Sequence, residues 1–424
     1  MLAVQARVLD LLKEIDEICS ANGIKYSLAG RTAAMQAEAG GWVGDDYCAE
    51  IMMTPDNFAK FEKVFEKLGE KTAAENGEGI GDMSARSLEH PGNNPKTDGI
   101  YARYTDLNTT LLDFKRGANV RDRGIFVKIY ILRSKAAKSR LDKVKEAVVA
   151  KNSIVDPGIN KRYAGKKEGL KLSGLKAARA AFGGAGAMKK YFAECTADDG
   201  KSKNYFYKDG DRKFAISRKL LDSYKRVEFE GIELSVVEKS DEMLKKMYAD
   251  GIAKELKGNR YPANEWGVYI DTENSFTDVE AEAKTRGIDF ARLAREKADY
   301  DEFSSKEFSR RQRAADVQFR QVWRTINRFR LLELYKGREE EIKKAYADGR
   351  IDEVRAELAD YIEMIENYEK KKMGFSYDRE LYNIACEIMI KDGKEKIVKK
   401  SRSYMPEEFK EDLADFLKKE GYNE

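Results

Sequence analysis

The sequence predicts an α+β fold, in which helices cover a mixed sheet, followed by a mainly α-helical C-terminal region. Within residues 1–133, amphipathic helical segments alternate with short β-prone runs, as in a sheet with flanking helices. The run "GIFVKIYIL" at residues 124–132 is nearly all β-branched or aromatic, which predicts a central, buried strand. From about Thr277 to the end the pattern is almost wholly helical and highly charged. We therefore expect a sheet-containing core over 1–133, a continuation with a helical insertion over 134–255, and a mainly α-helical region over 256–424.

The elements of the core follow from periodicity and from capping residues. Apolar positions at helical spacing predict helices over residues 2–22, 31–39 and 54–69. Thr54 suits the N-cap of the last helix, and Pro55 suits its first turn. Residues 70–99 carry neither pattern and are expected to form a loop. The β-prone runs predict strands over residues 24–30, 48–53, 100–106, 108–114 and 124–132.

The second part is expected to be helical and basic from residue 134 to about 226, with a turn-rich segment over residues 196–213. The stretch "VEFEGIELSVV" that follows predicts either a hairpin or a strand with a turn at Gly231, with Phe229 in the core. A helix capped by Ser240 is expected next.

The charge balance bears on the class of partner. The chain has 79 basic and 75 acidic residues, a net charge of +4, and the two signs are interspersed. Proteins dedicated to nucleic-acid binding usually concentrate positive charge in a patch or an arm. We therefore expect no nucleic-acid partner.

Cysteine spacing and hydropathy indicate the compartment. The four cysteines lie far apart and show no spacing typical of a disulfide framework or a zinc site, which favours a reducing, cytoplasmic setting. No apolar run approaches the roughly 20 residues needed to cross a bilayer, and the first residues are unlike a signal peptide. We expect a soluble, cytoplasmic protein without a transmembrane segment. The single histidine, His90, lies in an expected loop, so imidazole-based catalysis is not expected.

The stretch "GDDYCAEIMM" at residues 44–53 resembles a metal-binding strand that lacks one carboxylate. Acidic and apolar residues nearly alternate, as they do when a strand presents carboxylates on one face. Cys48, however, stands between Asp46 and Glu50. A free cysteine commonly acts as a small buried hydrophobe, and we expect that role for Cys48.

Six separated segments share their order and spacing with one known family: "LLKEIDEICSANGIKYSLAGRT", the acidic strand at 46–53, "YARYTDLNTTLL", "RGIFVKIYIL", "VEFEGIEL" and "DEMLKKMY". Over about residues 5–253 the chain thereby resembles the LicD family, which has a nucleotidyltransferase-like fold and is typified by phosphorylcholine transferases. The resemblance implies transfer of phosphocholine or a related phospho-alcohol from a CDP-activated donor to a cell-surface glycan. It also implies Mg²⁺, which neutralises charge that develops at phosphorus and prefers oxygen ligands.

The family's metal-binding positions are only partly kept. Asp46 matches the leading aspartate, Cys48 stands where the first metal-binding aspartate is expected, and Glu50 replaces the second. Lys128 stands where the third carboxylate is expected, and a charged lysine cannot coordinate a metal. We infer that the Lys128 ammonium takes the metal's place and pairs with Glu50, so that the magnesium site is dismantled. Asp46 and Glu50 then either contact a metal or nucleotide, or form a solvated or salt-bridged remnant.

The substrate-binding positions that the resemblance implies lie in two segments. Gly30 and Thr32 match the family's glycine-rich turn, with Arg31 in place of its second glycine. Arg31 is either a phosphate-binding residue or a surface or strand-pairing arginine. Arg103, Asn108 and Thr109 keep the family pattern and are expected to shape the donor pocket.

Three functions follow from these residues. The leading expectation is a LicD-like transferase of cell-surface glycans, with Asp46, Glu50 and Lys128 as its catalytic residues. The alternative is a catalytically inactive pseudoenzyme that binds a nucleotide or glycan, or acts as a scaffold through a protein partner at the C-terminal helices. The third is a metal-independent transferase, in which Lys128 and Arg31 stabilise the phosphoryl charge.

Overall fold

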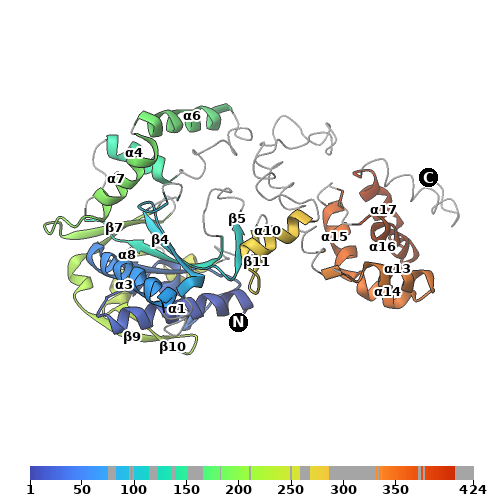
Figure 1. Ribbon diagram of the computed structural model, residues 1–424, viewed down its shortest axis with the longest axis horizontal. Helices are drawn as coiled ribbons and strands as arrows, with labels where there is room; N and C mark the ends of the chain where they lie inside the picture. Colours follow the sequence, from blue (N-terminus) through green and yellow to red (C-terminus); the bar gives the residue numbers. More distant parts are fainter. Residues whose placement is uncertain are drawn as a thin grey trace. The chain divides into compact units, whose positions relative to one another are not determined.

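The computed structural model divides into two compact units, Met1–Arg295 and Glu296–Glu424, and each is described by itself. The residues that the structure describes are 1–74, 83–94, 97, 100–113, 123–134, 140–150, 166–181, 183–209, 212–248, 251–257, 268–285, 331, 334–335, 337–370, 374–375 and 378–405. Strands and many helices form the first unit, and the described part of the second is helical (Figure 1). The expected α+β class is therefore confirmed at the level of a mixed sheet with helices.

A five-stranded mixed sheet forms the centre of the first unit, in the order β1-β2-β6-β4-β3. Its strands are β1 (Ser27–Leu28), β2 (Ala49–Met53), β6 (Ile125–Ile131), β4 (Tyr101–Asp106) and β3 (Arg86–Glu89). β2 and β6 are parallel, and the other neighbours are antiparallel. Every residue of β6 is buried, so the prediction of a central, buried strand is confirmed.

One face of this sheet packs against two helices with apolar stripes, α1 (Ala3–Ala21) and α3 (Pro55–Ala74). Tyr104 of β4 lies edge-on to Phe61 and Phe65 of α3, at centroid distances of 6.1 and 5.9 Å. Its hydroxyl donates to Glu14 of α1 at 3.0 Å. Burial raises the pKa of Tyr104 above its usual value, so the phenol remains a donor. Because side chains alternate along each strand, the residues between those on this face point to the opposite face.

The N-terminal elements follow the sequence closely. The helices expected over 2–22, 31–39 and 54–69 are α1, α2 (Gly30–Ala39) and α3, and the Thr54 hydroxyl accepts from the Asn57 amide at 3.4 Å, as expected of a helix cap. The loop expected over 70–99 is wrong in part, because α3 continues to Ala74 and β3 forms there. β3 is a short edge strand of weak β propensity, and its pairing with β4 decides its conformation.

The segment expected to be helical or turn-rich up to residue 226 contains a hairpin instead, made of β7 (Asn204–Asp209) and β8 (Arg212–Ser217). Tyr205, Tyr207, Phe214 and Ile216 are buried at alternate positions, a period of two that the surrounding turn-forming residues concealed. Backbone hydrogen bonds of 2.8 Å between Arg133 and Phe206 join the hairpin to the end of β6. Tyr207 then packs on Tyr130 at 4.6 Å, on the face opposite α1.

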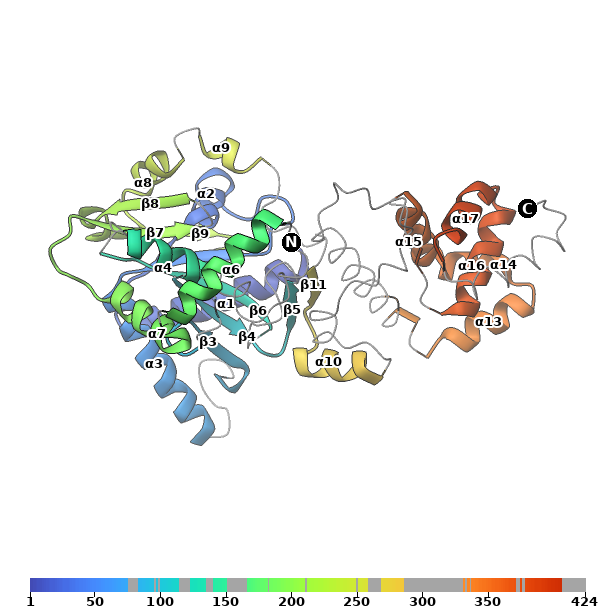
Figure 2. The ribbon, with the colours of Figure 1, turned by 90° about the horizontal axis from the view of Figure 1, so that it is seen from above.

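Three helices of the predicted insertion are present: α4 (Arg140–Ala150), α6 (Lys166–Ala181) and α7 (Gly184–Thr196). They contact one another in sequence order and lie side by side in both ribbon views (Figures 1 and 2). Strand β5 (Thr110–Asp113) does not join the main sheet, but pairs with β11 (Val268–Asp271), which lies in a segment expected to belong to the C-terminal region.

The hairpin expected at residues 227–237 is confirmed as β9 (Tyr224–Phe229) and β10 (Ile232–Val237). Glu230 and Gly231 both have positive φ, 52° and 81°, as a two-residue turn of type I′ requires. Phe229 is fully buried, as expected. The next helices are α8 (Ser240–Met247) and α9 (Ile252–Glu255), and Lys239 rather than Ser240 is the N-cap residue of α8.

Helices also account for the described part of the C-terminal region beyond β11. α10 (Phe276–Thr285) belongs to the first unit. The second unit contains α13 (Glu339–Ala347), α14 (Ile351–Glu357), α15 (Ala359–Lys370), α16 (Arg379–Lys391) and α17 (Glu395–Arg402). Its core includes the buried rings of Tyr335, Tyr361, Tyr368 and Tyr382. The predicted helicity of residues 286–330 lies outside the described residues.

We expect Asp378→Ala to lower the free energy of unfolding of the second unit by about 1 kcal/mol. The Asp378 carboxylate caps α16 by accepting from the Leu381 amide at 2.9 Å, a donor that has no partner within the helix. Denaturant unfolding followed by circular dichroism measures the change. Asp378→Asn is the matched control, since asparagine caps equally well, and an equal loss in both variants would assign the effect to charge instead.

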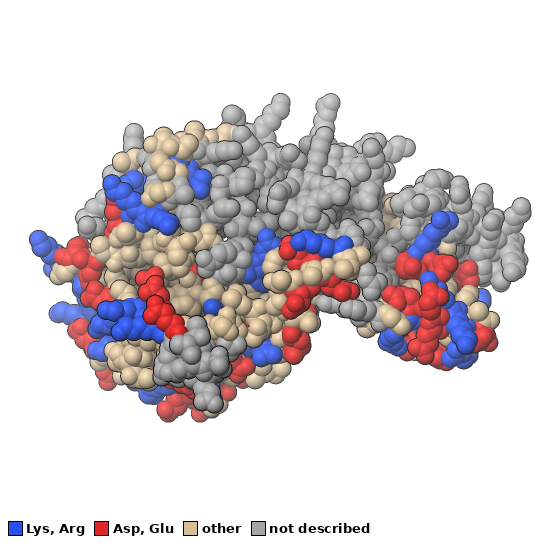
Figure 3. Space-filling model, viewed as in Figure 1, with Lys and Arg blue, Asp and Glu red and all other residues tan. Residues whose placement is uncertain are grey.

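Two surface properties complete the description. Lys and Arg side chains are interleaved with Asp and Glu side chains over the described residues on the face drawn in Figure 3. Among the described residues, no helix is both long and apolar enough to span a membrane.

Candidate functional site

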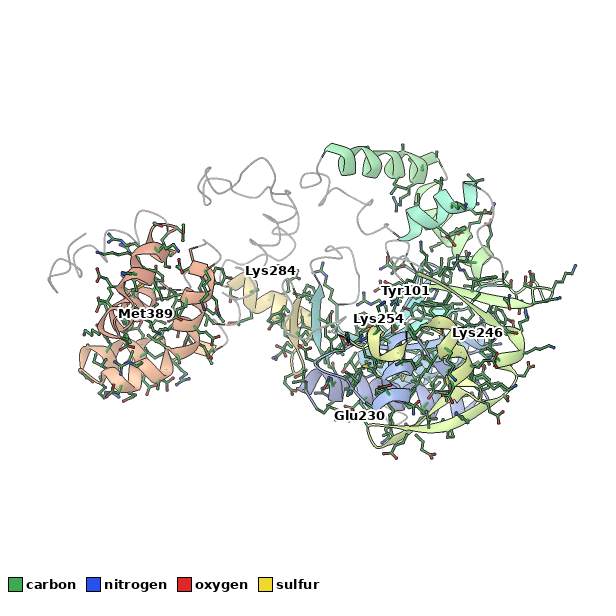
Figure 4. The ribbon with its side chains drawn as sticks, turned by 180° about the vertical axis from the view of Figure 1, so that it is seen from behind. Tyr101, Glu230, Lys246, Lys254, Lys284 and Met389 are labelled. Atoms are coloured by element: carbon green, nitrogen blue, oxygen red, sulfur yellow. The ribbon has the colours of Figure 1, made fainter. Side chains whose placement is uncertain are left out.

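The β9–β10 hairpin and α1 both hydrogen-bond to residues 40–46, the segment that leads into β2. The Glu230 amide donates to the Gly40 carbonyl at 3.0 Å, and the Glu230 carboxylate accepts from the Trp42 amide at 2.6 Å. Figure 4 shows Glu230 near the tip of the β9–β10 hairpin. From α1, the buried Gln5 amide donates to the carbonyls of Gly44 and Asp46, both at 3.0 Å. Asp46 therefore enters the site on a fixed backbone.

The start of α2 is built around the side chain of Glu50. Gly30 has a φ of +52°, and a Cβ there would lie 2.1 Å from the Glu50 Oε2 atom. The next residue, Arg31, donates its backbone N–H to the same oxygen at 2.9 Å. The Thr32 hydroxyl accepts from the Glu50 amide at 2.8 Å. The turn at 30–32 thus encloses a carboxylate, which suits the positive end of a helix.

On its other side, Glu50 faces Lys128. The two residues are partners in the parallel β2–β6 register, and the Lys128 Nζ lies 3.6 Å from Glu50 Oε1. Tyr130 bridges them, since Lys128 donates to the Tyr130 hydroxyl at 2.7 Å and this hydroxyl donates to Glu50 at 2.8 Å. The rings of Tyr130 and Tyr101 lie 4.5 and 4.9 Å from the ammonium, within cation–π range. The structure therefore contains the Glu50–Lys128 pair that the sequence predicted.

Asp46 is engaged by a different cation. The Arg31 guanidinium donates its Nε–H to the Asp46 carboxylate at 2.5 Å, and both side chains are almost fully buried. Arg31 is thus neither the surface arginine nor the strand-pairing arginine of the sequence alternatives. Its backbone N–H donates to Glu50, whereas its guanidinium donates to Asp46.

Four charged residues form one row across the sheet, which we call the cross-strand row: Glu50 of β2, Lys128 of β6, Arg103 of β4 and Glu89 of β3. Register partners on neighbouring strands project to the same face. All four are buried, with at most 6% of each residue exposed, and two carboxylates flank two cations. Buried positions in the middle of a sheet are ordinarily apolar, and charged residues are rarely found there. We therefore take the cross-strand row as the candidate site.

Asn108 and Thr109 lie at the turn between β4 and β5. Thr109 is buried, donates its hydroxyl to the Asp106 carbonyl and accepts from the Ile125 amide, both at 2.9 Å. The exposed Asn108 donates its backbone N–H to the Asp106 carboxylate at 3.0 Å. Asp106 follows Arg103 by three residues, about 10 Å along a strand. The described contacts of Asn108 and Thr109 thus shape the turn and do not include the residues of the cross-strand row.

The residues present do not fit Mg²⁺. This ion needs several oxygen ligands with available lone pairs, whereas Asp46 faces the Arg31 guanidinium and Glu50 faces an ammonium and a phenol. The Cys48 thiol is buried and its sulfur lies 3.8 Å from the Ala49 carbonyl oxygen, as expected of a small core residue. No group of three His, Cys, Asp or Glu side chains suited to a metal ion occurs within the described ranges.

Sequence reasoning missed three residues of the site. Tyr130 follows Lys128 by two positions, so strand alternation alone would have placed it on the same face. Tyr101 stands opposite Tyr130 in the β4–β6 register, and the register follows only from the tertiary fold. Glu89 lay in a segment read as loop.

His90 has a structural environment outside the cross-strand row. Its ring stacks on Phe192 at 4.8 Å, its Nε2 lies 2.6 Å from the Glu62 carboxylate, and its Nδ1 accepts from the Gly92 amide. The histidine thus connects α3, the end of β3 and α7. The expectation that it has no catalytic role stays a prediction.

Comparison with known proteins adds no assignment. No protein-family model matches the chain, and no curated protein matches it in sequence. The similarity to the LicD family therefore stays a prediction that depends on the six segments and on the chemistry of the site.

Proposed function

We propose that the protein is a LicD-like member of the nucleotidyltransferase fold that binds a CDP-alcohol donor without Mg²⁺ and does not transfer it. The observation that carries this proposal is the Lys128 ammonium beside Glu50, at the position where the family would hold a metal ion. A cation fixed by the chain supplies part of the positive charge that the metal would supply. Lys128 and Tyr130 engage Glu50, and Arg31 engages Asp46, so neither carboxylate is available as a ligand or a base.

The proposal predicts donor binding that is independent of divalent ions. Calorimetric titration of CDP-choline, and then of other CDP-alcohols, is expected to give the same affinity in Mg²⁺ and in chelator, because Asp46 and Glu50 each face a cation of the chain. An affinity that rises by about tenfold or more with Mg²⁺ would contradict it. A lack of any binding would leave the scaffold role of the inactive pseudoenzyme instead.

A metal-independent transferase is the second candidate, and the pair of adjacent buried cations, Lys128 and Arg103, favours it. Fixed cations in a poorly hydrated site can stabilise charge that develops at a phosphoryl group. Arg31, expected to share this role, pairs with Asp46 instead. Release of CMP from CDP-choline in chelator, with glycan acceptors present, would distinguish this candidate from the inactive one.

The partner and the compartment complete the proposal. A glycan acceptor and a protein partner at the C-terminal helices stay predictions, tested by loss of the partner when residues 277–424 are removed. We place the protein in the cytoplasm, with the burial of all four cysteines as support.

A further inference from the structure

Arg103 is a buried cation with no counter-ion among the described residues. Only 6% of it is exposed, and its guanidinium carbon lies 4.1 Å from the centroid of the Phe126 ring. Its Nε–H is buried and lacks a hydrogen-bond partner within the part of the chain that the structure describes. Glu89, which stands opposite in the β3–β4 register, is not one of its hydrogen-bond or ion-pair partners.

The other buried arginines of the described chain show how unusual this is. Arg31 pairs with Asp46, and Arg133 pairs with Glu146 at 2.7 Å. An arginine keeps its charge in proteins, and a buried charge is normally paired because its desolvation is costly. No described residue therefore supplies the anion that normally accompanies a buried guanidinium such as that of Arg103.

The surroundings of Arg103 supply more groups suited to an anion. Thr105, two residues along β4 and on the same face, is fully buried, and its hydroxyl has no hydrogen-bond partner among the described residues. Lys128 is the register partner of Arg103 on β6. Tyr101, labelled in Figure 4, lies on this face and is partly exposed, and its ring lies against the Lys128 ammonium.

We propose that Arg103, Thr105 and Lys128 form a subsite for the oxygens of a phosphate or diphosphate group. An arginine fork and a hydroxyl match phosphate oxygens, and the stacked Phe126 ring fixes the plane of the fork. This inference deepens the proposed function, since the diphosphate of a CDP-alcohol is one source of such a group and free pyrophosphate is another. It places the negatively charged diphosphate of the donor at Arg103 and not at Arg31.

The test uses the full chain in chelator, with pyrophosphate and CDP-choline titrated separately. Pyrophosphate is expected to bind the natural protein. Arg103→Met is expected to weaken this binding by about 10-fold to 100-fold, the range for a lost hydrogen bond to a charged group. Thr105→Val is expected to weaken it by about 2-fold to 10-fold. The control is Arg226→Met. Arg226 lies on the β9–β10 hairpin, is partly exposed and pairs with Asp16, so its loss should leave the pyrophosphate affinity unchanged.

Thermal melting of the free protein separates a binding role from a structural one. Arg103→Met and Thr105→Val should melt no lower than the natural protein, because each removes a buried polar group without a partner. A lower melting temperature together with unchanged pyrophosphate affinity would overturn the subsite, as would a natural protein that does not bind pyrophosphate.

The two probes also separate this inference from the proposed function. Pyrophosphate binding that depends on Arg103, without binding of CDP-choline, keeps the subsite and refutes the CDP-alcohol donor. CDP-choline binding that Arg103→Met leaves unchanged keeps the donor and refutes the subsite.

Discussion

Lys128→Met is expected to lower the free energy of unfolding by about 3–5 kcal/mol, because it leaves the Glu50 carboxylate buried without a counter-charge. Methionine keeps most of the apolar stem of the lysine, so the loss reports the charge more than the packing. Glu50 is fully buried and Lys128 is 5% exposed, which means that water cannot replace the lost partner. Denaturant unfolding, monitored by fluorescence and circular dichroism, measures this free energy.

A second substitution tests the cause of this loss. Lys128→Met combined with Glu50→Gln removes both charges and is expected to recover most of the stability, since replacing a buried pair by neutral groups is often nearly neutral. The glutamine can still accept a hydrogen bond at the turn of 30–32. The double-mutant cycle then gives the coupling free energy of the pair. Equal losses in the single and double variants would show that packing dominates.

The exposed pair of Lys246 and Glu242 is the matched control. Its N–O distance is 2.6 Å, shorter than the 3.6 Å between Lys128 and Glu50, but both side chains are about half exposed. Lys246→Met is expected to change the stability by no more than the error of the measurement, since water screens such pairs. Burial, and not the distance between the charges, should therefore decide which lysine matters.

Gly30→Ala is expected to lower the free energy of unfolding by about 3–5 kcal/mol, from two causes. A φ of +52° is unfavourable for any residue with a Cβ, at about 1–2 kcal/mol. The new Cβ would also lie 2.1 Å from Glu50 Oε2, so the carboxylate must leave the Arg31 amide and the Tyr130 hydroxyl. A hydrogen bond to a charged group contributes about 1.5–3 kcal/mol.

Gly40 at the other end of α2 separates the two causes. Its φ is +65°, but a Cβ there would meet no atom within 4 Å. Gly40→Ala is therefore expected to lower the same free energy by only the backbone contribution, about 1–2 kcal/mol. If denaturant unfolding gave equal losses for Gly30→Ala and Gly40→Ala, the Glu50 carboxylate could not be the reason that position 30 is a glycine.

Local pattern predicted much of the core of the fold. The first three helices and the strands β2, β4 and β6 lie where periodicity and turn residues indicated, because in these segments local propensity and burial agree. The errors fall on strands with weak local signals. β3 is short, and β7 and β8 lie among turn-forming residues, so their pairing partners decided their conformation.

Some contacts of the candidate site could likewise be predicted from the sequence, and others could not. That Lys128 would meet Glu50 was predictable, because a central strand next to the acidic strand leaves few registers that bury both apolar faces. The orientation of Arg31 toward Asp46 was not, since its side chain and backbone N–H serve different carboxylates. The Tyr130 bridge needed only strand alternation, whereas the position of Arg103 beside Lys128 needed the β4–β6 register.

By itself the sequence determined the α+β class, the central buried strand, and the presence of Cys48 between Asp46 and Glu50 and of Lys128 on the central strand. These features depend on residue type and short-range periodicity, which a linear chain displays directly. The tertiary structure alone decided that β5 pairs with β11, and that Glu89 and Arg103 join Glu50 and Lys128 in one row. Strand pairing brings together residues far apart in the chain, and so it decides which buried charges gain a partner. Glu50 gains Lys128, whereas the Nε–H of Arg103 gains no hydrogen-bond partner among the described residues.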